Sequence, residues 1–140
     1  MRYLGLDLGT TTCGVAITDK TNTLVSPLKL IKFTKENYSE ALKKIINIVN
    51  DKNIDLIVLG LPKNMDNSLG FAANRSLNFK KMLEDNNLRV ELQDERLTSV
   101  EAINIMKNNG IRKINKKNKT DLIAATIILE SYLKRLEYDK

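Results

Sequence analysis

The strongest constraint on the fold is the pattern of the first nineteen residues, which read MRYLGLDLGTTTCGVAITD. Two apolar runs of strand length flank a Gly-Thr turn, and this pattern predicts two strands with a short connection. Asp7 interrupts the first run between Leu6 and Leu8. Aspartate is rare in strands, and its charge is costly there unless a cation or hydrogen-bond donors compensate it. The segment therefore indicates either a carboxylate that holds a divalent metal or a turn that holds a nucleotide phosphate.

The size and composition of the chain are those of a soluble globular protein. It has 140 residues, of which 42% are hydrophobic, so we expect a single domain over residues 1–140. No apolar run approaches the roughly 20 residues that cross a bilayer, and the N-terminus is unlike a signal peptide. We therefore expect a cytoplasmic protein with no membrane partner. The single cysteine, Cys13, excludes an internal disulfide.

Histidine is absent from the chain, which excludes Ser-His and Cys-His catalysis and every His-ligated metal site. Any chemistry must use carboxylates, hydroxyls, lysines, arginines or a hard cation. The net charge of +6 favours an anionic partner. Residues 112–119 carry five basic side chains and no acidic one. This segment is either a solvated loop or a segment that contacts phosphates. The seven aromatic residues are scattered, so we expect phosphate contacts rather than base stacking to dominate binding.

The remaining pattern predicts an α/β fold in which helices cover both faces of a mixed sheet. Short connections between the first three strands indicate an antiparallel meander, and the later alternation of strands and helices indicates parallel strands with helical crossovers. The predicted strands span residues 2–8, 13–18, 24–31, 55–61 and 89–93, and the predicted helices span residues 35–52, 68–87, 99–109 and 120–137.

Three acidic residues occupy positions where a surface charge is not expected. Asp7 lies in the first strand, Glu95 just past the strand at 89–93, and Asp121 at the start of the last helix. Each has a simple structural explanation, such as a turn, an ion pair or the helix dipole. However, the carboxyl ends of parallel strands share one edge of a sheet, where open α/β sheets bind ligands. Three carboxylates that meet there repel one another, and hard oxygen donors suit Mg²⁺ or Mn²⁺.

Four segments carry a family resemblance, and they occur in the order GLDLGTTTCGVAITD, GLPKNMDNSLG, DERLTSVEA and KTDLIAATIIL. Together they resemble the YqgF family, also called RuvX, of Holliday-junction-resolvase-like proteins and pre-16S ribosomal RNA nucleases, over residues 3–133. The resemblance implies an RNase H-like fold with the sheet order 3-2-1-4-5. It also implies a metal-dependent nuclease that processes the 5′ end of pre-16S ribosomal RNA, with ribosomal assembly particles as partners.

The resemblance also assigns roles to individual residues. Asp7, Glu95 and Asp121 match the catalytic carboxylates, which would hold Mg²⁺ or Mn²⁺. Arg96 and Thr98 complete the DERLT segment and would orient Glu95 or contact a phosphate. The expected substrate contacts further include Thr10 and Thr11 in the first turn, Lys63 and Asn64 in the loop after GLP, and the basic residues Arg112, Lys113, Lys116, Lys117 and Lys119.

Three other functions stay open at this point. The DLGTT segment also resembles the first phosphate loop of Hsp70 and sugar kinases, although nucleotide binding there needs two such domains around a cleft. A non-catalytic RNA- or ribosome-binding module would account for the basic charge. A Holliday-junction resolvase acting on DNA would need a dimer for symmetric cleavage, whereas no exposed apolar stripe indicates one. We therefore expect a monomer or weak homodimer.

Overall fold

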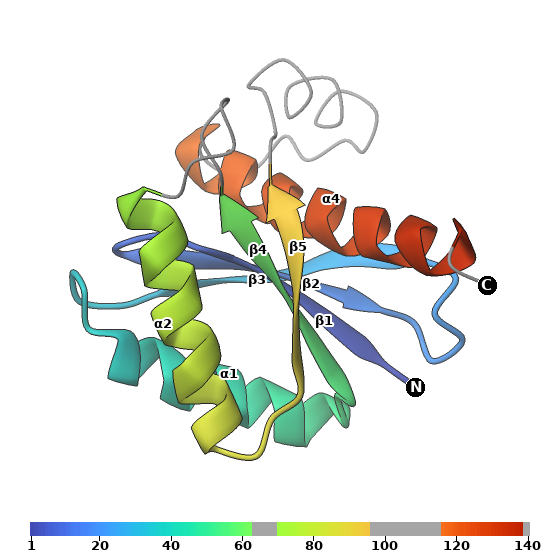
Figure 1. Ribbon diagram of the computed structural model, residues 1–140, viewed down its shortest axis with the longest axis horizontal. Helices are drawn as coiled ribbons and strands as arrows, with labels where there is room; N and C mark the ends of the chain where they lie inside the picture. The colour runs from blue at the N-terminus through green and yellow to red at the C-terminus, as the bar shows by residue number, and fades with distance from the viewer. Residues whose placement is uncertain (63–69, 96–115, 139–140) are drawn as a thin grey trace.

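The computed structural model describes residues 1–62, 70–95 and 116–138, and in the last range the side chains from 121 to 137. A five-stranded sheet lies between helices on both of its faces (Figure 1). The elements are β1 (Tyr3–Leu8), β2 (Thr12–Thr18), β3 (Val25–Lys32), α1 (Tyr38–Lys52), β4 (Leu56–Pro62), α2 (Phe71–Asp85), β5 (Val90–Glu95) and α4 (Lys116–Tyr138).

The strand order is β3-β2-β1-β4-β5, which confirms the predicted order. The first three strands are antiparallel, whereas β4 runs parallel to β1 and β5 runs parallel to β4. Two predicted boundaries were wrong near the site. Glu95 is the last residue of β5 rather than a loop residue, and α4 begins at Lys116 rather than at residue 120. The predicted helix at 99–109 lies outside the described residues.

The two faces of the sheet have separate hydrophobic cores. Leu4, Leu6 and Leu8 pack with residues of α1 and α2 on one face, while Tyr3 packs with α4 on the other. Successive side chains of a strand point to opposite faces, so Asp7 lies on the α4 face. Although α4 has 23 residues, no helix in the described ranges is both long and apolar enough to span a membrane.

Three glycines allow α4 to lie very close to the sheet. A Cβ added at Gly5 would lie 2.9 Å from the carbonyl oxygen of Ala125, and one at Gly14 would overlap the backbone carbonyl of Asp121. At Gly60 an added Cβ would lie 2.5 Å from Cδ1 of Ile128. Glycine in a strand often marks such a close approach. These three positions therefore fix how near α4 comes to β1, β2 and β4.

The Gly14 contact can be tested by adding one methyl group. We expect Gly14→Ala to lower the free energy of unfolding by about 1–3 kcal/mol, because α4 must move outward to admit the Cβ. Urea denaturation followed by circular dichroism measures this loss. Gly9→Ala is the milder control, because its Cβ would lie 3.1 Å from the nearest atom, the carbonyl oxygen of Thr12. A Gly14→Ala protein as stable as the wild type would contradict the close packing.

Candidate active site

Two carboxylates meet at the edge of the sheet where the parallel strands end. Asp7 is the last but one residue of β1, and Glu95 is the last residue of β5. The strand between them, β4, has no side chain at Gly60, and Oε2 of Glu95 lies 2.8 Å from the position that a Cβ there would occupy. The Glu95 side chain therefore crosses β4 toward Asp7. The Asp7 carboxyl donates a hydrogen bond to that of Glu95.

Burial and mutual repulsion change the acidity of this pair. Burial raises the pKa of Asp7 well above its usual range, and the charges of Glu95 and Asp121 raise it further. Burial and the charge of Asp121 also raise the pKa of Glu95, although the hydrogen bond from Asp7 opposes that rise. Two adjacent carboxyls in such surroundings retain a shared proton when no cation is present. Strongly perturbed carboxyls at a ligand-binding edge of a sheet are typical of a functional site.

Asp121 belongs to the same cluster but is held by a different partner. Its backbone lies against Gly14, the residue that pairs with Asp7 across β1 and β2. Thr12 Oγ1 donates a hydrogen bond of 2.8 Å to Oδ2 of Asp121. The carboxylate therefore has a defined orientation while its charge acts on both Asp7 and Glu95.

The expected position of Asp121 in the first turn of its helix was wrong. The helix continues backward through residues 116–120, where no glycine or proline breaks it, so Asp121 lies in the second turn. The helix dipole acts mainly within the first turn and does not account for a carboxylate at this place. The contact with Thr12 does account for its orientation.

The donor set fits a hard divalent cation in its chemistry. All three side chains offer carboxylate oxygens, which Mg²⁺ and Mn²⁺ prefer, and a cation would relieve the repulsion that raises the pKa of Asp7. Within the described ranges, however, no three Asp, Glu, His or Cys side chains are already grouped as a metal site. Asp7 and Glu95 bond to each other and Asp121 bonds to Thr12, so the trio must reorient to share an ion.

The other predicted site residues divide into two sets. Thr10 and Thr11 lie in the turn after β1, where their carbonyl oxygens accept hydrogen bonds from the amides of Glu36 and Phe33 at 2.8 and 2.9 Å. Their side chains are partly exposed at the carboxylate edge. The remaining predicted contacts, Lys63, Asn64, Arg96, Thr98, Arg112 and Lys113, lie outside the described residues, as do the side chains of the helical residues Lys116, Lys117 and Lys119.

Sequence reasoning missed three residues that shape the site: Thr12, Gly60 and Arg75. Gly60 is a glycine inside an otherwise apolar strand, which is a recognisable sign of a close approach. Thr12 follows two other threonines, and nothing in the sequence distinguishes the one that reaches Asp121. Arg75, whose charge lowers the pKa of Asp7, lies on α2 with no motif around it.

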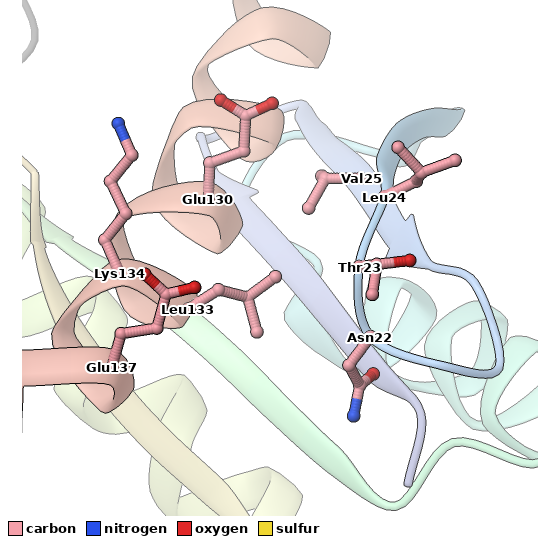
Figure 2. A pocket seen from close by; sticks show the side chains of 8 residues that line it. All are labelled: Asn22, Thr23, Leu24, Val25, Glu130, Leu133, Lys134 and Glu137. Carbon is pink, nitrogen blue, oxygen red and sulfur yellow. The ribbon is translucent and has the colours of Figure 1, made fainter. Parts of the chain in front are cut away.

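A surface pocket elsewhere on the molecule contains none of these residues. It lies between the turn that joins β2 to β3 and the C-terminal half of α4, as Figure 2 shows. Its lining residues are Asn22, Thr23, Leu24, Val25, Glu130, Leu133, Lys134 and Glu137. The pocket is at the edge where β2 ends, opposite the edge where β2 begins beside the carboxylates.

The raised pKa of the buried Asp7 carboxyl predicts that the stability of the protein depends on pH. The pKa of Asp7 in the folded state lies above its unfolded value of about 4, so the folded state binds more protons between these two pKa values. The free energy of unfolding therefore falls as the pH rises from the unfolded pKa through the folded pKa. In metal-free buffer at neutral pH, we expect Asp7→Asn to raise Tm by a few degrees, as a change of about 1 kcal/mol would. The gain should shrink as the pH falls toward 4.

Differential scanning calorimetry at several pH values measures this effect. The matched control is Asp85→Asn at the exposed end of α2, which should leave Tm nearly unchanged. A lower Tm for Asp7→Asn at neutral pH would contradict the account of Asp7 as a repelled, buried carboxyl.

Comparisons with solved structures place the fold. The chain superposes on Thermus thermophilus RuvC in complex with Holliday junction substrate with a TM-score of 0.63 and 14% identity, covering 98% of this chain and 96% of that one. The fowlpox virus Holliday junction resolvase gives a TM-score of 0.61 at 20% identity over 96% and 99% of the two chains. At these identities the likeness concerns the fold alone, and it confirms the expected RNase H-like architecture.

Sequence comparisons identify relatives over the full length of the chain. A protein of Lactobacillus gasseri is 38% identical over 143 residues, covering 100% of both chains, and one of Onion yellows phytoplasma is 42% identical over 132 residues, covering 93% of this chain and 87% of that one. A Bacillus subtilis protein is 38% identical over 97% of this chain and 99% of its own. Each bears the name "Putative pre-16S rRNA nuclease". The family model RuvX, Holliday junction resolvase, matches residues 1–135, and the chain therefore belongs to the RuvX family.

Proposed function

We propose that this protein is a cytoplasmic, metal-dependent nuclease that hydrolyses phosphodiester bonds in structured RNA and processes the 5′ end of pre-16S ribosomal RNA. The observation that carries the proposal is the meeting of Asp7, Glu95 and Asp121 at one sheet edge, where burial and the neighbouring charges raise the pKa of the first two. The names of the full-length relatives support ribosomal RNA as the substrate. The charge of +6 suits a polyanionic partner.

In this mechanism Asp7, Glu95 and Asp121 would hold one or two Mg²⁺ or Mn²⁺ ions. A divalent ion in such a site activates water and stabilises the leaving oxygen of a phosphodiester. Thr12 orients the Asp121 carboxylate through its hydroxyl. Asp7 must release the proton that it shares with Glu95 before both can act as ligands, so cation affinity should fall at low pH. Arg75 and the basic residues at 112–119 would neutralise the RNA backbone.

Cleavage of a DNA junction is the second candidate. The family description and the fold shared with a junction-bound RuvC favour it, although a fold alone is a weak indication of substrate. A non-catalytic RNA-binding module would have no use for the paired carboxyls of Asp7 and Glu95. A nucleotide-binding domain of the Hsp70 type would need a second such domain around its cleft. All of these alternatives predict distinct outcomes in one assay.

The assay compares a pre-16S 5′ fragment with a synthetic four-way junction, each with Mg²⁺ or Mn²⁺. We expect the purified protein to cut the RNA, and Asp7→Asn or chelation by EDTA to lower the rate by about 100-fold or more. RNA binding by Asp7→Asn should persist, because the contacts to phosphates are elsewhere. Cleavage of the RNA by Asp7→Asn at the wild-type rate would contradict the mechanism, and cleavage of the junction alone would replace RNA by DNA as the substrate.

Thr12 provides a test of the positioning of Asp121. We expect Thr12→Val to lower the cleavage rate by about 10- to 100-fold and to raise the Mg²⁺ concentration needed for half-maximal activity, because the orienting hydroxyl is lost. Thr12→Ser keeps a hydroxyl and should recover most of both properties. Equal metal requirements for Thr12→Val and wild type would assign the contact to stability alone.

A further inference from the structure

Phe71 is a large aromatic residue that lies on the surface instead of in a hydrophobic core. It is the first residue of α2, and 92% of its surface is exposed, more than any other large hydrophobic side chain described. It stands off the helix stripe that packs against the sheet, which consists of Ala73, Ser76, Phe79 and Leu83. An aromatic ring in this position contributes nothing to the core and forgoes the stabilisation that burial provides.

The topology brings Phe71 to the edge that carries the carboxylates. The helix α2 connects the parallel strands β4 and β5, so it runs antiparallel to them and begins at the edge where they end, as Figure 1 shows. Pro62 and Glu95 are paired at the ends of these two strands. Because α2 covers the face opposite α4, Phe71 approaches this edge from the other side of the sheet.

Arg75 lies one helical turn after Phe71, and residues four apart share one side of a helix. Its positive charge lowers the pKa of Asp7, so it lies within electrostatic range of the site. The side chain is half-buried and forms no salt bridge with another residue of the described ranges. A guanidinium that no described carboxylate contacts in a salt bridge is suited to a phosphate group.

We propose that Phe71 and Arg75 form a nucleotide subsite beside the carboxylates, in which the ring stacks on an unpaired base and the guanidinium contacts the adjoining phosphate. This inference rests on the proposed nuclease function and makes its substrate more specific. A ring can stack on a base only where that base is free of its duplex neighbour. The preferred substrate therefore has an unpaired or helix-terminal nucleotide near the cleaved bond, and a perfect duplex is disfavoured.

The absence of tryptophan from the chain gives a direct test, because Phe71→Trp introduces a unique fluorophore. In the Asp7→Asn background, which prevents cleavage, we expect single-stranded RNA from the pre-16S 5′ end to quench Trp emission at position 71. The matched control is Leu24→Trp in the same background. Leu24 is 68% exposed and lines the pocket at the opposite edge, so its emission should not change (Figure 2).

Affinity measurements separate the two contacts. We expect Phe71→Leu, which keeps an apolar side chain but loses the aromatic face, to weaken RNA binding about tenfold without changing its salt dependence. Arg75→Gln should instead lower the slope of log affinity against log salt by about one unit, as loss of one phosphate contact does. Both effects should be small for a perfect RNA duplex.

The outcomes distinguish this inference from the proposed function. Equal quenching at positions 71 and 24, or unchanged RNA affinity of Phe71→Leu, overturns the subsite while RNA cleavage by the wild type leaves the function standing. Quenching at position 71 by the four-way junction but not by RNA supports the subsite and contradicts RNA as the substrate. A wild-type protein that neither binds nor cleaves any nucleic acid overturns both.

Discussion

Contact between α4 and bare backbone of the sheet determines the geometry of the whole site. Gly5 and Gly14 present no side chains to the helix, so its backbone rests on the strands themselves. The distance from Asp121 to the end of β1 and the start of β2 follows from this contact rather than from any contact between the acidic groups. A helix held off by ordinary side chains would place Asp121 too far outward for the hydroxyl of Thr12. Packing on small residues thus positions a polar cluster.

The same cluster opposes the stability of the fold that holds it. Burial and the charge of Glu95 both disfavour the ionised form of Asp7. No described salt bridge to Asp7 or Glu95 offsets the cost of ionising them. The hydrophobic layers on the two faces of the sheet must offset this cost. Such local destabilisation is expected where a protein keeps groups ready for a ligand instead of satisfying them internally. It is also consistent with the proposed cation, whose charge would remove the conflict.

Much of this architecture could be predicted from the sequence, because apolar periodicity is strong in most elements. The apolar run at 55–61 predicted the central parallel strand. The acidic residues in unexpected positions identified Asp7, Glu95 and Asp121 as candidates for the site. The start of α4 was misplaced because a lysine-rich segment such as 116–119 suits a helix and a solvated loop equally well. Thr12 and Arg75 were missed because their importance depends on which side chains lie opposite them, and a single sequence gives no such pairing.

The order of the elements along the chain also has a consequence for synthesis. Asp7 comes from the first strand and Asp121 from the last helix, and the sheet places them together only when both are in position. A nascent chain on the ribosome therefore cannot assemble all three carboxylates until α4 has emerged. If the protein cuts ribosomal RNA, a chain that is still being translated therefore lacks the complete carboxylate site.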